Sequence, residues 1–114
     1  LNEETKYLID NEYLNKFSKN IFLINTSRGK IIKTNDLIKN IKSGKIIGAG
    51  LDVLESENVN FEDLNVTNTD ELKFLKKSPK VILTPHIAGW SHESNILMSK
   101  ILTKKILSHL KSIK

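Results

Sequence analysis

Arg28 is the first residue of this sequence whose side-chain type suggests a specific chemical role. It lies in the stretch INTSRGK and is the only arginine, although lysine is abundant. A guanidinium is planar and permanently protonated, and it binds a carboxylate through two parallel hydrogen bonds, which lysine does not. The excess of isoleucine, lysine and asparagine suggests an AT-rich genome, in which a dispensable arginine would drift to lysine. We therefore interpret Arg28 as a group that binds an anion or a developing alkoxide, in preference to a surface ion pair.

His86, in LTPHIAGW, is the second candidate, because it follows a proline and precedes a turn of small residues. A lone loop histidine more often satisfies backbone groups, but a histidine beside a carboxylate can act as a general acid or base. Glu55 and Glu57 each provide such a carboxylate. Either would hold the imidazole in one tautomer and favour its protonated form. Spacing alone does not choose between them.

Asp52 follows GAGL at the end of an apolar run, where a carboxylate is costly without polar partners. Its alternatives are a cap for a neighbouring loop or a contact to a ligand. GAG itself is not a dinucleotide fingerprint, because Val53 stands where another glycine is needed, and no phosphate-binding loop occurs. The remaining histidines, His92 and His109, have no partners at metal-ligand spacing, so no metal site is expected. Trp90 suits a packing anchor and a pocket wall equally well.

The elements that position these residues alternate along the chain. Apolar periodicity predicts helices and strands in turn, with Asp10 and Thr34 as N-caps and Gly44 ending a helix in the left-handed conformation. The continuous apolar run IFLIN indicates a strand buried on both faces of a sheet. The expected helices cover 11–17, 35–43, 70–77 and 91–114, and the expected strands cover 21–25, 45–53 and 80–84. Such alternation predicts an α/β fold with a parallel sheet and right-handed crossovers.

The candidate residues follow the carboxyl ends of the three predicted strands. These ends are continued by 25–28, 52–57 and 84–89, which hold the arginine, the carboxylates and the histidine. Ligands of open parallel sheets bind at this edge. We therefore expect the three groups to meet at one site.

Composition excludes several other classes of protein. The net charge is +5, but the lysines are scattered and aromatic residues are few, which favours a solvated surface over a nucleic-acid interface. The absence of cysteine is compatible with a reducing cytoplasm. No apolar run approaches the roughly 20 residues that a membrane helix needs. The sequence begins at Leu1 and runs directly into patterned sequence, so we expect a fragment.

The segment from INTSRGK to GLDVLESE, followed by VILTPHIAGW, resembles the C-terminal signatures of the D-isomer-specific 2-hydroxyacid dehydrogenases. The resemblance implies a Rossmann-like parallel sheet with flanking helices, forming the second half of a doubly wound nucleotide-binding domain. Residues 1–93 would belong to this domain, and 94–114 would form a helix returning toward a substrate domain. Because the other half would precede Leu1, we expect exposed apolar surface on that helix and on the edge strand.

The resemblance also implies roles for single residues. Arg28 would orient a 2-oxo acid, His86 would protonate its carbonyl oxygen, and Glu57 would be the partner of His86. The cofactor would be NAD, contacted by the following residues: Thr26, Ser27, Arg28, Asp52, His86, Ile87, Ala88 and Gly89. The implied protein is a cytoplasmic oxidoreductase, homodimeric when complete, acting on a small 2-hydroxy or 2-oxo acid. The alternative is an NAD-binding, corepressor-like regulatory protein of the same fold. The sequence does not specify which 2-hydroxy acid is used, nor NAD against NADP.

Overall fold

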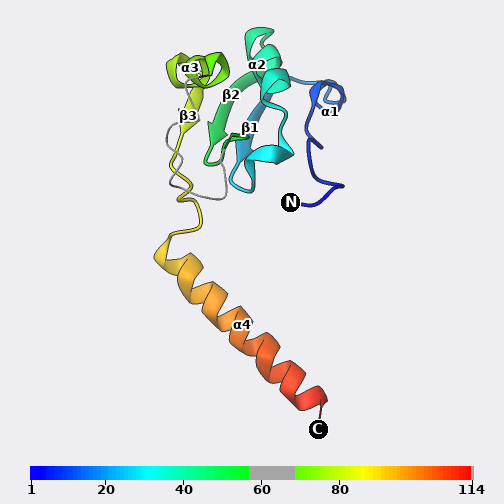
Figure 1. The fold of residues 1–114 in the computed structure, drawn as a ribbon, viewed down its shortest axis with the longest axis vertical. Helices are drawn as coiled ribbons and strands as arrows, with labels where there is room; N and C mark the ends of the chain where they lie inside the picture. The colour runs from blue at the N-terminus through cyan, green and yellow to red at the C-terminus, as the bar shows by residue number, and fades with distance from the viewer. Residues whose placement is uncertain (57–68, 114) are drawn as a thin grey trace.

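The protein forms a three-stranded parallel sheet with helices packed on one face, as the computed structural model shows (Figure 1). The structure describes residues 1–56 and 69–113. In chain order the elements are α1 (Asn11–Asn15), β1 (Ile21–Asn25), the 3-10 turn η1 (Gly29–Ile31), α2 (Thr34–Lys42), β2 (Ile46–Leu51), α3 (Asp70–Lys77), β3 (Val81–Leu83) and α4 (His92–Ser112). The alternation predicted from the sequence is therefore confirmed, although α1 is shorter than expected.

The three strands are in the order β1-β2-β3, and their carboxyl ends are level. Asn25 at the end of β1 is aligned with Leu51 of β2, and Leu51 is aligned with Leu83 at the end of β3. The loops that follow β1, β2 and β3 therefore begin at the same edge of the sheet. This edge is where the candidate residues were expected to meet.

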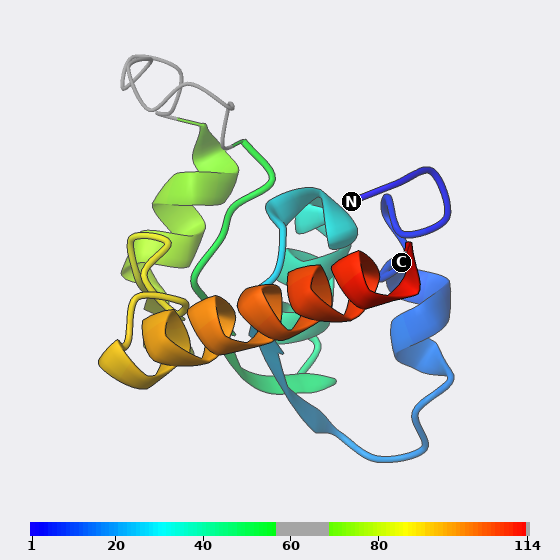
Figure 2. The ribbon, with the colours of Figure 1, turned by 90° about the horizontal axis from the view of Figure 1, so that it is seen from below.

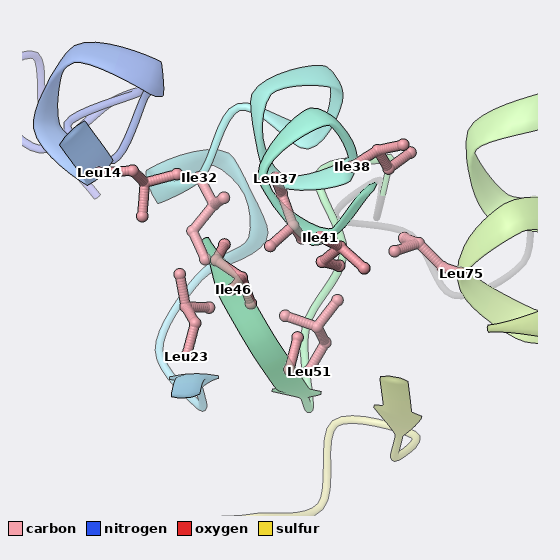
Figure 3. Close-up of a cluster of buried hydrophobic side chains, with 10 residues drawn as sticks. Leu14, Leu23, Ile32, Leu37, Ile38, Ile41, Ile46, Leu51 and Leu75 are labelled. Carbon is pink, nitrogen blue, oxygen red and sulfur yellow. The ribbon is translucent and has the colours of Figure 1, made fainter. Parts of the chain in front are cut away.

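The core lies between the sheet and helices α1, α2 and α3. Figure 3 shows Leu37 and Ile41 of α2 directed toward Ile46 and Leu51 of β2, while Leu75 approaches from α3. Alternate residues of β1 contribute to the same cluster, since Leu23 is buried while its neighbours are not. Burial of these side chains orders the strands relative to α2 and so fixes the positions of the strand ends.

The opposite face of the sheet is uncovered, which corrects the expectation that IFLIN is buried on both faces. Phe22 and Ile24 of β1 are 72% and 78% exposed, and Ile82 of β3 is 71% exposed. A continuous apolar run predicts two covered faces, but within the described residues only one face has helices packed on it. The exposed apolar surface predicted for the edge strand is confirmed.

Helix α4 extends away from the sheet beyond its carboxyl ends and has no buried residue (Figures 1 and 2). Ser91 caps its first turn by accepting a hydrogen bond from the backbone N–H of Ser94, at 3.0 Å. The large apolar side chains along this C-terminal segment are exposed, among them Ile96, Leu97, Ile101, Leu102, Ile106, Leu110 and Ile113. This confirms the expected exposed apolar surface of the last helix.

Two of the three helix-terminating signals predicted from the sequence, Asp10 and Gly44, are confirmed, and the third, Thr34, is wrong. Asp10 accepts a hydrogen bond from the backbone N–H of Tyr13, and Gly44 ends α2 at a φ of 84°. Thr34 was predicted as the N-cap of α2, but it is the first helical residue, and Lys33 occupies the cap position without a capping side chain. The carboxylate that caps this helix comes from Glu55, which accepts a hydrogen bond from the Thr34 N–H at 2.8 Å.

Truncation of Ile46 is expected to destabilise the protein strongly. Its side chain is fully buried in the core, and removing such a group costs about 2–5 kcal/mol through lost transfer energy and a residual cavity. Ile47 is the matched control, because it is the next residue of β2 and is 44% exposed on the other face. Urea denaturation should show a large loss for Ile46→Ala and less than about 1 kcal/mol for Ile47→Ala. Equal losses would contradict the assignment of the covered face.

Candidate active site

The carboxyl ends of the three strands are joined by backbone hydrogen bonds. The N–H of Asp52 donates to the carbonyl oxygen of Asn25 at 2.9 Å, and the N–H of Thr84 donates to that of Leu51 at 3.0 Å. The loops that begin at these residues therefore start from fixed points. Since neighbouring strands are about 4.8 Å apart, the outer two ends lie roughly 10 Å from each other.

Asn25 organises the loop that carries Arg28. Its buried amide donates to the carbonyl oxygen of Arg28 at 3.0 Å and accepts from the N–H of Ser27 at 3.1 Å. Local side-chain bonds of this kind mimic a backbone turn. Arg28 itself is exposed, and its Nη1 donates to the carbonyl oxygen of Ser27 at 2.7 Å. The loop thus presents the guanidinium at the sheet edge.

Gly29 allows this loop to touch the loop that follows β2. A Cβ atom at Gly29 would lie 1.8 Å from the carbonyl oxygen of Leu54 and 2.6 Å from the backbone nitrogen of Glu55. No side chain fits there unless backbone moves. The residue after Arg28 must therefore be glycine for the two loops to pack as they do.

Asp52 is buried and holds the loop that contains His86. Its carboxylate accepts hydrogen bonds from the Thr84 hydroxyl at 2.6 Å, the Ile87 N–H at 2.9 Å and the Ala88 N–H at 2.9 Å. The Thr84 hydroxyl, with smaller effects from Ala88, Ile87 and the charge of His86, holds the pKa of Asp52 below its usual value despite burial. Asp52 therefore caps this loop, one of the two roles that the sequence left open.

His86 occupies a backbone conformation that is uncommon for residues other than glycine. Its φ is 56°, in the left-handed region, and its N–H donates to the carbonyl oxygen of Thr84 at 3.0 Å. The side chain is half-buried. Strained backbone of this kind persists only where surrounding contacts hold it, and here Asp52 binds the next two residues.

The structure places most of the predicted site residues on the loops that follow β1 and β3, at one edge of the sheet. Thr26, Ser27 and Arg28 follow β1, and His86 to Gly89 follow β3, with Asp52 between them at the end of β2. Glu57 lies outside the described residues. Glu55, the other carboxylate considered as a partner for His86, is directed to the start of α2 instead. No cluster of three or more potential metal-ligating His, Asp or Glu side chains occurs in 1–56 and 69–113.

A family model described as D-isomer specific 2-hydroxyacid dehydrogenase, NAD binding domain, matches residues 1–88. The chain belongs to this dehydrogenase family. The match confirms the recognition made from the sequence, the Rossmann-type fold and NAD as the cofactor of the domain. None of the helices in the part of the chain that the structure describes is both long and apolar enough to cross a membrane.

Individual dehydrogenases of the family are similar over nearly the whole chain. Glyoxylate reductase of Thermococcus litoralis is 38% identical over 111 residues, which are 97% of this chain and 30% of the relative. A D-specific alpha-keto acid dehydrogenase of Enterococcus faecium is 39% identical, over 82% of this chain and 30% of the relative. The NAD-complexed D-isomer specific 2-hydroxyacid dehydrogenase of Lactobacillus delbrueckii ssp. bulgaricus superimposes with a TM-score of 0.72 at 34% identity, covering 98% of this chain and 35% of the other. The chain thus spans about a third of the length of these dehydrogenases.

Three residues have structural roles at this edge of the sheet that were not predicted from the sequence. Asn25 shapes the arginine loop, Gly29 permits its contact with Leu54, and Glu55 binds the start of α2. A signal existed for the first two, since an asparagine at a strand end followed by a glycine is typical of a tight turn. For Glu55 there was no local signal, because its partner Thr34 is 21 residues away.

Replacing Asp52 by Asn is expected to weaken the dehydrogenase domain at neutral pH and to reduce its sensitivity to acid. An amide directed at two N–H donors and a hydroxyl places a donor where an acceptor is needed. The lowered pKa of Asp52 in the folded state means that the charged form stabilises the fold above the unfolded pKa of about 3.9. That contribution is lost as pH falls through the folded pKa.

The measurement is urea denaturation at pH 7 and at pH 3. The stability gap between wild type and Asp52→Asn should be clear at pH 7 and narrower at pH 3. Asp70→Asn is the control, since the Asp70 side chain is 97% exposed in a surface pair with Lys73. A gap for Asp52→Asn that stays constant with pH would show that the carboxylate charge does not hold the loop.

Proposed function

We propose that this chain is the nicotinamide-binding and catalytic part of an NAD-dependent D-2-hydroxyacid dehydrogenase. The observation that carries the proposal is the pair of loops at one sheet edge, one presenting Arg28 and the other presenting His86, tied to level strand ends. The two outer strand ends lie roughly 10 Å apart, so loops that begin there can bring a carboxylate-binding fork and a proton donor to either side of a small 2-oxo acid. The family match supports the same assignment.

Each residue has a defined task in the reductive direction. Arg28 binds the substrate carboxylate through two hydrogen bonds and brings positive charge near the carbonyl oxygen. NADH, once bound beside this edge, would supply the hydride that the carbonyl carbon accepts. His86 donates its proton to the carbonyl oxygen as negative charge develops there, so that the product is a 2-hydroxy acid and the imidazole is left neutral. In the reverse direction the neutral imidazole removes the hydroxyl proton.

The residues at this edge suit the nicotinamide end of the cofactor. Ile87 is 42% exposed and offers an apolar surface to a flat ring, and a Cβ at Gly89 would meet nothing within 4 Å. On the loop that follows β1, Thr26 and Ser27 are exposed and offer hydroxyl groups. Asp52 retains acceptor capacity on Oδ2 beside its bond from the Ala88 N–H, and an amide N–H of the cofactor is a suitable donor.

Glu57 is proposed as the carboxylate partner of His86, which leads to a test by pH. Reduction requires the protonated imidazole, so the rate falls at the alkaline limb of the pH profile. Glu57→Gln removes a charge that favours the protonated form, so this limb should move to lower pH. Glu71→Gln, a carboxylate on α3, is the control and should leave the profile unchanged. An unmoved limb in Glu57→Gln rejects the pairing.

The substrate class is proposed as small 2-oxo acids, since relatives are named for glyoxylate and for D-specific alpha-keto acids. The complete gene product should oxidise NADH when given glyoxylate, pyruvate or a branched 2-oxo acid, and it should form the D-isomer where the product is chiral. The complete protein is proposed to be cytoplasmic and homodimeric, with 94–114 linking the domain to a substrate domain. If NADH binds but no 2-oxo acid is reduced, the regulatory, corepressor-like alternative is supported instead.

A further inference from the structure

The loop that carries Arg28 is fastened at several points, and Glu55 is common to most of them. At its start, Gly29 packs directly on the backbone of Leu54 and Glu55. At its end, the N–H of Thr34 donates to Glu55 Oε2 at 2.8 Å. Leu54 and Glu55, which follow β2, therefore contact the segment from Gly29 to Thr34 at both of its ends.

Tyr7 adds a third attachment from the N-terminal segment. Its backbone N–H donates to the carbonyl oxygen of Lys30 at 2.8 Å. Its phenol lines the same surface cavity as Glu55, whose carboxylate raises the pKa of Tyr7. Tyr7 has a φ of 54°, which makes it, with His86, one of two non-glycine residues in the left-handed region within the described chain. Backbone strain of this kind is retained where surrounding contacts enforce it. Here the hydrogen bond to Lys30 and the interaction with Glu55 supply that enforcement.

The Glu55 carboxylate is suited to this position by charge as well as by geometry. Partial burial disfavours its charge, but hydrogen bonds from Thr34, together with the nearby Tyr7 and Lys30, outweigh burial and lower the pKa of Glu55. Glu55 lies at the N-terminus of α2, where the aligned N–H groups of the first helical turn carry partial positive charge and favour an anion. Lys33 at the cap position provides no capping side chain. Glu55 therefore caps the N-terminus of α2, a role that the residue preceding a helix usually has.

We propose that Glu55 is a positioning residue for Arg28: by binding Thr34 and interacting with Tyr7 it fixes the Gly29–Thr34 loop against the end of β2 and so sets the place of the guanidinium. This inference rests on the proposed function, because it assigns Glu55 a part in substrate binding. Arg28 is exposed and bonded only to the adjacent Ser27 carbonyl among the described contacts of its side chain, so its position depends on its backbone. Loosening the loop would displace a group whose two-point geometry matters.

The test compares Glu55→Gln with Glu71→Gln and Tyr7→Phe in the complete gene product. Glu71 is the matched control, since it lines the same roughly 350 Å³ surface cavity from the first turn of α3. Glu55→Gln should raise the KM for the 2-oxo acid about tenfold or more and lower kcat, with little change in the KM for NADH. Tyr7→Phe should change the same two parameters in the same direction by a smaller factor, and Glu71→Gln should change neither.

Backbone amide exchange supplies a readout that does not depend on activity. In Glu55→Gln the amides from Gly29 to Thr34 should exchange faster than in wild type, while those of β2 keep their protection. Loop amides that loosen without any change in the 2-oxo acid KM would make Glu55 a structural cap alone and overturn the proposal. Unchanged exchange in both Glu55→Gln and Tyr7→Phe would also overturn it. If wild type binds NADH but reduces no 2-oxo acid, the proposed function fails and, with it, the role of Glu55 in substrate binding; the exchange data then report only whether Glu55 holds the loop.

Discussion

Replacing Arg28 by Lys should reduce kcat/KM for a 2-oxo acid by about 10²- to 10³-fold, the loss seen when one preorganised donor to a developing oxyanion is removed. Lysine keeps the positive charge but offers a point charge on a flexible stem in place of a planar fork. It therefore cannot bind both carboxylate oxygens while also lying beside the carbonyl oxygen. Because Arg28 is exposed and its side chain donates to the carbonyl oxygen of the adjacent Ser27, the substitution should leave the fold intact.

Lys30→Arg is the control for this experiment. Lys30 is exposed and belongs to the same loop, two residues after Arg28. A guanidinium at this position therefore tests whether the place of the group in the loop matters. Adding a guanidinium there should change kcat/KM by less than a factor of about three, because the substitution keeps the positive charge near Glu55 and surface substitutions have small effects. Comparable losses in the two variants, measured as steady-state oxidation of NADH, would show that loop charge rather than the Arg28 fork is required.

The fold was predictable from the sequence because its local signals agree with one another. Apolar runs, Asp10 as a cap and Gly44 as a stop each depend on residues within a few positions, and all three are present in the structure. The covered face of the sheet was not predictable in the same way. Phe22 and Leu23 are both apolar, yet one is exposed and the other buried, since burial depends on which helices are packed nearby.

In the candidate site, too, the residues were predictable from the sequence but their long-range contacts were not. Arg28, Asp52 and His86 were identified from residue type and strand-end position, and the structure places all three at the carboxyl edge. The hydrogen bonds that hold these residues in place were not predictable from the sequence. Asp52 to Ala88 spans 36 residues and Glu55 to Thr34 spans 21, distances over which sequence patterns carry no pairing information. Thr34 was wrongly predicted as the N-cap of α2, because the carboxylate of Glu55 caps this helix instead.

Replacing His86 by Asn should remove proton donation while preserving the loop. His86 has a φ of 56°, and asparagine is among the few residues that adopt this region readily, so the backbone should keep its conformation. The amide cannot deliver a proton to the carbonyl oxygen. Loss of a positioned general acid costs about 10²- to 10⁴-fold in rate. We expect kcat for 2-oxo acid reduction to fall by that factor, with NADH binding by fluorescence changed little.

The pH dependence distinguishes a lost proton donor from a displaced loop. Wild-type reduction should slow as pH rises, because the imidazole loses the proton that it must donate. The residual rate of His86→Asn should be nearly independent of pH over the same range. His92→Asn, at the exposed start of α4, is the control and should keep both the rate and the profile. If His86→Asn retained the wild-type profile, the proton would have to come from another group, and the pairing of Arg28 with His86 across the sheet edge would no longer explain catalysis.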